Sequence, residues 1–367
     1  MLQLVKGIDM GVFRTNSMLA GAIAVAALTL SACASGVRDT SGPSTLAQPP
    51  ANAHDLEQAY VSVVQRVLPS VVQITTDRAL GSGIVFDTKG NIVTNAHVAG
   101  QATKFQVRLA DNPRSIPATL VGTYQPDDLA VIKLDQPPPS LHSAHFGDSA
   151  RLQVGDIVMA MGNPLGLTGS VTEGIISATG RTVTEPAGGS SPGATLPEAI
   201  QTSASINPGN SGGALVDLAG DVIGIPTLAA LEPSGDGGGT APAPGIGFAI
   251  PSNVVTDIAG QLIAHNGHVI NSHRAQLGVR VATVVDPTGQ PVGMGVVSVV
   301  AGGPAAAAGV QPGEVITAVN NTPVHSASEL AQVLAKLDPG QTVPVTLTNP
   351  QGGSRTVMVT LGQLPGS

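Results

Sequence analysis

The chain has 367 residues and lacks several features that define other classes of protein. Cys33 is its only cysteine, so no disulfide bond can form within the chain. Lysine and arginine total 16 and form no cluster, which makes nucleic acids and anionic lipid surfaces unsuitable partners. Aromatic residues make up only 2%, whereas Gly (46) and Pro (29) are abundant. This composition is typical of a turn-rich β protein rather than a helical bundle.

The N-terminus has the pattern of an export signal. Lys6 and Arg14 precede an apolar run from Met18 to Leu30, which is short for a membrane span and ends in small residues. The run leads into Leu-Ser-Ala-Cys33, which resembles the bacterial lipobox, in which the cysteine is lipidated. We therefore predict a lipoprotein signal peptide over residues 1–32 and lipidation of Cys33. The alternative is an ordinary signal peptide followed by an incidental cysteine.

The next segment, residues 33–54, is rich in Ser, Gly, Pro and Ala, a composition typical of a flexible tether. Together with a diacylated Cys33, it predicts an extracytoplasmic protein anchored to the bacterial cell membrane.

The folded part divides into two predicted domains, 55–266 and 272–363. The first begins with a helix over 55–68 and ends with a helix over 253–265, and short strands lie between them, as in a sandwich or a pair of barrels. Its strand candidates are Val71–Thr75, Ile84–Phe86, Ile92–Thr94, Lys104–Leu109, Ile116–Val121, Leu129–Leu134, Ile157–Met161, Val171–Ala178, Ala214–Val216 and Val222–Ile225. Two inserts of Gly, Pro, Ala and Ser, Gly188–Pro197 and Pro233–Pro244, are predicted loops.

A glycine-rich stretch, Asn207-Pro208-Gly209-Asn210-Ser211-Gly212-Gly213, contains one serine. Such a run favours a tight, exposed turn, because glycine reaches backbone angles that are costly for other residues. A serine there would have an exposed hydroxyl beside converging N–H groups, which an acyl-transfer nucleophile needs. The alternative is a plain surface turn.

A serine nucleophile needs a base and a group that orients the base. Among eight histidines, His97 ends a β run, so a rigid scaffold can fix it. Asp128 leads directly into an apolar strand, where a carboxylate must be paired, whereas Asp127 fits a solvated turn. Two His-x-x-His pairs, at 142/145 and 265/268, lack nearby carboxylate or cysteine ligands, so we predict neither a metal site nor a cofactor.

Several motifs follow one another in one register, namely Thr94-Asn95-Ala96-His97-Val98, Asp128-Leu129-Ala130-Val131-Ile132-Lys133, Gly147-Asp148-Ser149, Gly162-Asn163-Pro164-Leu165-Gly166 and Ile206-Asn207-Pro208-Gly209-Asn210-Ser211-Gly212-Gly213. Together these motifs resemble the HtrA/Deg family of serine proteases. The resemblance implies a mainly β fold, with a chymotrypsin-like double β-barrel protease domain. It also implies an ATP-independent endopeptidase that cleaves unfolded or damaged exported proteins in protein quality control and stress response, and a homotrimer by analogy.

The resemblance also implies residue roles. Ser211 would attack the scissile carbonyl, His97 would accept its proton and Asp128 would orient His97. The backbone N–H groups of Gly209, Asn210 and Ser211 would form the oxyanion hole. The chain departs from the family in having no acid in Gln201-Thr202-Ser203-Ala204-Ser205 and in having Pro226 where asparagine is common; both positions are expected to affect substrate preference and activation.

The second predicted domain resembles a PDZ domain, a small α+β barrel. Leu277-Gly278-Val279 resembles the loop that binds a peptide carboxylate, and a predicted helix over 326–336 carries Leu330 and Leu334, candidates for the side-chain pocket. A peptide C-terminus would add as a strand to the sheet edge. The alternatives are a domain that serves only as a spacer and, for the whole chain, a proteolytically silent anchored chaperone or peptide sensor.

Overall fold

The structure is a computed structural model that describes residues 51–77, 79–112, 114–163, 169–185, 194–207, 209–233, 240–349 and 352–366. The predicted signal peptide, Cys33 and nearly all of the predicted tether lie outside these residues. Within the described residues, no helix is both long enough and apolar enough to cross a membrane.

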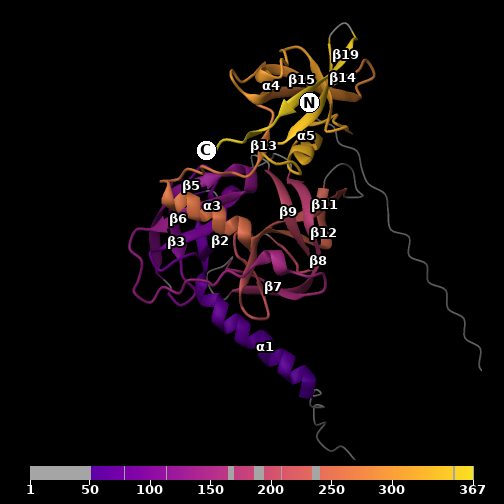
Figure 1. Cartoon of the computed structure of the whole chain (residues 1–367). Coiled ribbons are helices and arrows are strands. Elements are labelled where there is room, and N and C mark those ends of the chain that lie inside the picture. Colours follow the sequence, from indigo (N-terminus) through magenta and orange to yellow (C-terminus); the bar gives the residue numbers. More distant parts are fainter. Residues whose placement is uncertain are drawn as a thin grey trace, which may run out of the picture. The chain divides into compact units, whose positions relative to one another are not determined.

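The first element is helix α1 (Ala51–Val67), drawn in indigo in Figure 1. It begins four residues before the predicted start and passes into a short 3-10 helix, η1 (Leu68–Ser70). Pro69 lies in η1, and the residue before a proline disfavours the α conformation, which explains why α1 ends at Val67. Val63 and Val67 are buried against the strands that follow.

Six strands form a closed barrel with the order β1-β2-β3-β6-β5-β4. All neighbouring pairs are antiparallel. The strands are β1 (Val71–Thr75), β2 (Leu80–Val85), β3 (Asn91–Asn95), β4 (Lys104–Arg108), β5 (Ser115–Tyr124) and β6 (Leu129–Leu134). Two short helices sit at strand ends, α2 (Ala96–Ala99) after β3 and η2 (Gln125–Asp127) before β6.

A second closed barrel has the order β10-β11-β12-β9-β8-β7. Its strands are β7 (Ile157–Gly162), β8 (Ser170–Glu185), β9 (Ala194–Thr202), β10 (Ala214–Asp217), β11 (Val222–Pro233) and β12 (Thr240–Pro251). A one-turn 3-10 helix, η3 (Ser149–Arg151), precedes β7. The strand pattern predicted either a sandwich or a pair of barrels, and the structure is a pair of barrels.

Strands β9 and β12 are absent from the predicted strands, and both begin inside segments predicted as loops. Residues 194–197 belong to β9 and residues 240–244 to β12. The sequence Thr-Ala-Pro-Ala-Pro-Gly-Ile-Gly has low strand propensity, yet β12 pairs with β11 on one side and β9 on the other. Barrel closure gives the strand partners on both edges, and this tertiary context outweighs local propensity.

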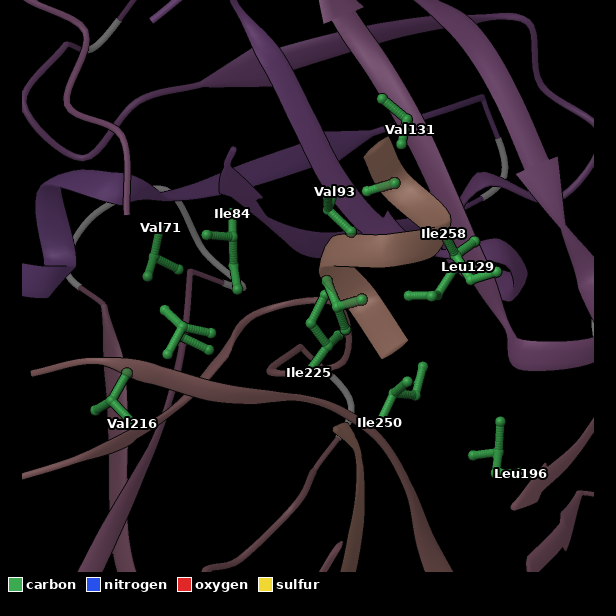
Figure 2. Packing of buried hydrophobic residues seen from close by; sticks show 14 of the residues in the cluster. Val71, Ile84, Val93, Leu129, Val131, Leu196, Val216, Ile225, Ile250 and Ile258 are labelled. Carbon is green, nitrogen blue, oxygen red and sulfur yellow. The ribbon is translucent and has the colours of Figure 1, made fainter. Parts of the chain in front are cut away.

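The two barrels pack against each other through one apolar cluster. Figure 2 shows side chains from both barrels converging on helix α3 (Ser252–Ala264). The labelled residues are Val71, Ile84, Val93, Leu129 and Val131 from the first barrel, Leu196, Val216, Ile225 and Ile250 from the second, and Ile258 from α3. Each fully buried side chain of this kind contributes about 1.5–3 kcal/mol, so the cluster fixes the barrels in one arrangement and positions the site between them.

The C-terminal domain has its own core of buried residues and a main sheet of order β14-β15-β16-β18-β19. The elements are β13 (Ala275–Gln276), β14 (Val279–Val285), β15 (Pro291–Val299), α4 (Pro304–Ala307), β16 (Val315–Val319), β17 (Thr322–Pro323), α5 (Ala327–Leu334), β18 (Thr342–Thr348), β19 (Ser354–Thr360) and β20 (Gly362–Gln363). Ser326 caps α5 by accepting a hydrogen bond from the N–H of Glu329 at 3.1 Å. Strand β14 is an edge of the sheet, and none of the described strands pairs with its outer side.

Candidate functional site

The first barrel brings His97 and Asp128 together. His97 lies on α2 after β3, and Asp128 lies between η2 and β6, with φ of 51°. Because β3 pairs with β6 at Asn95 and Leu129, the residues that flank this pair are neighbours. His97 Nδ1 and Asp128 Oδ2 are 2.8 Å apart, and the backbone N–H of His97 donates to Asp128 Oδ1 at 2.9 Å.

Asp128 is held on both sides while being almost wholly buried, with 3% of its side chain exposed. Thr227 of β11 donates from Oγ1 to Asp128 Oδ2 at 2.5 Å, and the backbone oxygen of Asp128 accepts hydrogen bonds from the N–H of Ala96 and from Asn95 Nδ2. A buried carboxylate is tolerated when its oxygens accept hydrogen bonds. Sequence reasoning did not find Thr227, because a lone hydroxyl after Pro226 gives no signal of a partner about a hundred residues away.

Ser211 enters from the second barrel, in the turn between β9 and β10. Its Oγ donates to the backbone oxygen of Thr227 at 3.2 Å, so Thr227 contacts Asp128 with its side chain and Ser211 with its backbone. The backbone oxygen of Ser211 accepts from the N–H of Ser82 on β2 at 3.1 Å. Thr227 of the second barrel therefore links Asp128 of the first barrel to Ser211.

Hydrogen bonds inside the glycine-rich turn fix its shape. Asn210 accepts from the N–H of Asn207 at 3.0 Å and donates from Nδ2 to the oxygen of Ser205 at 3.0 Å. Its own backbone N–H donates to the oxygen of Asn207 at 3.1 Å. Asn210, one of three predicted oxyanion-hole donors, thus uses its N–H within the turn. No described residue accepts from the N–H of Gly209 or Ser211.

Gly212 shows why the turn needs glycine. Its φ is 79°, and a Cβ there would lie 2.3 Å from the oxygen of Ser82 and 2.4 Å from Oγ1 of Thr94. A side chain is therefore excluded both by backbone conformation and by close approach of the first barrel.

Asp127, expected to be a solvated turn acid, is instead buried and ion-paired with Arg274 of the segment that follows α3. The pairing joins Asp127 Oδ1 to Arg274 Nη1. Burial raises the pKa of Asp127 to about 6, against the opposing effect of Arg274, and the Asp257 carboxylate raises it further. Burial and the Asp127 carboxylate also raise the pKa of Tyr124 to about 12. Arg274 could not be predicted as the partner of Asp127, because it lies 147 residues away along the chain.

In the C-terminal domain, Leu277, Gly278 and Val279 line a cavity of about 220 Å³ between β14 and α5. Leu330 and Leu334 of α5 line the same cavity, as does Arg274. Gly278 has φ of 71°, a conformation that favours glycine. The loop and helix residues predicted for peptide binding are therefore brought together beside an open sheet edge.

Among the described residues, no group of three or more His, Cys, Asp or Glu side chains could hold a metal ion. His145, which belongs to one of the two His-x-x-His pairs, is exposed, and its Nδ1 lies 2.8 Å from Oδ1 of Asp221.

The first closed barrel carries a histidine–aspartate pair, and the second carries a serine on a glycine-rich turn. A small sheet domain with an apolar groove follows. This arrangement is that of a trypsin-like serine peptidase with a PDZ domain. In agreement, residues 81–225 match the model of the trypsin-like peptidase domain, and residues 295–349 match that of a PDZ domain.

Similar proteins narrow the assignment. The serine protease PepD of Mycobacterium tuberculosis (strain ATCC 25618 / H37Rv) is 37% identical over 94% of this chain and 78% of its own length. A probable periplasmic serine endoprotease DegP-like of Rhizobium meliloti (strain 1021) is 40% identical over 78% of this chain and 54% of its own length. The solved structure of HtrA-type protease AlgW with decapeptide is 31% identical, covers 83% of this chain and 99% of its own, and has a TM-score of 0.55.

The chain belongs to the HtrA/Deg family and is a serine endopeptidase. The predicted double barrel and PDZ domain are confirmed. Pro226, at the position that departs from the family, lies within β11, where its oxygen accepts from the N–H of Gly212 at 3.0 Å.

Proposed function

We propose that His97, Asp128 and Ser211 form the catalytic triad of an endopeptidase that cleaves unfolded or damaged exported proteins without ATP. The observation that carries this proposal is the chain of contacts from His97 to Asp128 to Thr227 to Ser211. Asp128 accepts from His97 twice, once from the ring and once from the backbone, which orients the ring and its tautomer.

In the reaction, the Ser211 hydroxyl attacks the scissile carbonyl carbon while His97 takes its proton. The carbonyl oxygen becomes an oxyanion, which the N–H groups of Gly209 and Ser211 stabilise. His97, now an imidazolium paired with Asp128, gives the proton to the leaving amine. Water then attacks the acyl-enzyme while His97 takes its proton. His97 returns this proton to Ser211 as the peptide acid is released.

The PDZ groove is proposed to bind exposed peptide C-termini of substrates. Strand β14 is an unpaired edge, and the Gly278 turn and the leucines of α5 lie beside it, which suits addition of a peptide as a further strand. The proposed domains are 55–266 for the protease and 272–363 for the PDZ domain. The assembly is proposed to be a trimer by family analogy.

An extracytoplasmic location is supported by a relative described as periplasmic. Anchoring through lipidated Cys33 rests on the Leu-Ser-Ala-Cys motif of the sequence. To test it, wild type and Cys33→Ser are compared in membrane fractions and by metabolic fatty-acid labelling. Loss of the label and release from the membrane are expected. A Cys33→Ser protein that stays in the membrane with unchanged processing would refute the anchor.

The activity is tested with casein, an unfolded protein, on purified wild type and Ser211→Ala. Wild type should cleave it and the variant should not, while both keep the same thermal unfolding midpoint. Equal cleavage by both proteins would refute the role of Ser211. A fluorophosphonate probe that labels wild type at Ser211 would exclude the silent chaperone.

A further inference from the structure

One buried serine of the first barrel, Ser82, makes two hydrogen bonds to the glycine-rich turn of the second barrel, one with its side chain and one with its backbone. Its Oγ donates to the backbone oxygen of Gly209 at 2.5 Å and accepts from the N–H of Asn163 at 2.8 Å. Its N–H donates to the oxygen of Ser211 at 3.1 Å, and its oxygen accepts from Thr94 Oγ1 at 2.7 Å. The side chain is fully buried.

These contacts determine how the turn presents its N–H groups. The peptide group between Gly209 and Asn210 is planar, so its orientation is fixed when both ends are held. The Ser82 hydroxyl holds its oxygen, and the oxygen of Asn207 holds its N–H. This peptide lies directly between the N–H groups of Gly209 and Ser211.

Glycine at 209 makes that orientation easy to lose. Gly209 has φ of 116°, a backbone conformation that only glycine adopts at low energy. Because glycine has no Cβ, it can also adopt other φ and ψ values at little cost. Oxyanion donors act only when they lie about 2.7–3.1 Å from the developing charge. A turn free to rotate at Gly209 would therefore lose catalytic power without losing its fold.

We propose that the Ser82 hydroxyl is a positioning residue for peptide hydrolysis, holding the Gly209 peptide so that the N–H groups of Gly209 and Ser211 converge on the oxyanion. The proposal rests on the proposed role of Ser211. Ser82 itself is covered by Gly209 and Asn163 and acts through the turn, without touching the substrate.

A purely structural role of the Ser82 hydroxyl would lower the stability of the protein without lowering kcat, and the chain offers a matched control for this distinction. Ser252, at the start of α3, is equally buried and donates from Oγ to the oxygen of Gly147 at 2.6 Å. Both serines thus make a buried hydroxyl bond to a glycine oxygen, but only Ser82 bonds to the turn that carries Ser211.

The experiment compares Ser82→Ala with Ser252→Ala in the full-length protein. We measure thermal unfolding, kcat and KM on a fluorogenic peptide, and the affinity of a peptide boronate, which forms a tetrahedral adduct. The expected result is that both variants lose similar thermal stability. Ser82→Ala should lose about 10–10²-fold in kcat and in boronate affinity, somewhat less than removal of one oxyanion donor, with KM within about twofold.

The control Ser252→Ala should keep wild-type kcat within about twofold. The proposal is wrong if Ser82→Ala keeps kcat and boronate affinity as well as the control does, or if its loss falls on KM alone. If Ser82→Ala does not fold, Ser82→Cys replaces it, because a thiol of similar size is a weaker donor. A tenfold loss of kcat is then expected, and wild-type kcat would overturn the proposal. A wild type that cleaves nothing would instead refute the proposed function.

Discussion

The buried pair of Asp127 and Arg274 makes the stability of this protein depend on pH in an unusual direction. Burial raises the pKa of Asp127 from its ordinary 3.8 to about 6, so the folded protein binds a proton there more tightly than the unfolded chain. The stabilisation by that proton is fully present below pH 3.8 and is lost as pH rises through about 6. The charged groups facing Asp127 are Arg274, which opposes the shift, and Asp257, which adds to it.

The magnitude follows from the two pKa values. One pKa unit corresponds to about 1.4 kcal/mol, so the difference between 3.8 and about 6 corresponds to about 3 kcal/mol. Asp127→Asn removes the titration. The free energy of unfolding of the variant, relative to the parent, should therefore rise by about 2–3 kcal/mol from pH 4 to pH 7.

The assay is urea unfolding at several pH values, in a Ser211→Ala background that prevents self-cleavage. Asp148→Asn is the control, because Asp148 is exposed and hydrogen bonds from Asn253 and Ala150 lower its pKa. The contribution of Asp148 to the free energy of unfolding is present above its ordinary pKa and is lost as pH falls. This pH dependence has the opposite sign to that of Asp127. A difference between Asp127→Asn and its parent that stays constant from pH 4 to pH 7 would refute this reasoning.

Three further outcomes are expected. Thr227→Val removes the hydroxyl that is bonded to Asp128 and should lower kcat on a fluorogenic peptide about tenfold, with little change in KM. An unchanged kcat would show that this hydrogen bond is not needed for catalysis. Gly212→Ala should be inactive and less stable by at least about 2 kcal/mol, because its Cβ meets backbone and φ is positive; a normal unfolding midpoint would contradict this. Ser326→Ala should destabilise the PDZ domain by about 1 kcal/mol in calorimetry and leave fluorophosphonate labelling unchanged; altered labelling would point to coupling between the domains.

The candidate triad was within reach of sequence reasoning because each member carries a local signal. His97 ends a β run, Asp128 precedes an apolar strand and Ser211 lies among glycines. The antiparallel pairing of β3 with β6 places Asn95 opposite Leu129, which brings the end of β3 next to the start of β6.

The supporting residues carried no such signal. Ser82 and Thr227 are single hydroxyl residues within strands, and their partners lie across the barrel boundary. Asp127 was misjudged because its cation comes from a distant segment of the chain. Strand β12 was missed for a related reason, since its pairing depends on barrel closure rather than on its own residues.

The division of the site between two barrels has a consequence for synthesis of the chain. The first barrel ends at Leu134 and carries His97 and Asp128, whereas Ser211 and Thr227 belong to the second, which closes only with β12 at Pro251. Domains fold as units and in chain order as they are made. A chain that ends before β12 therefore lacks a closed second barrel, so the proposed nucleophile Ser211 cannot be held beside His97 and Asp128 until synthesis has passed Pro251.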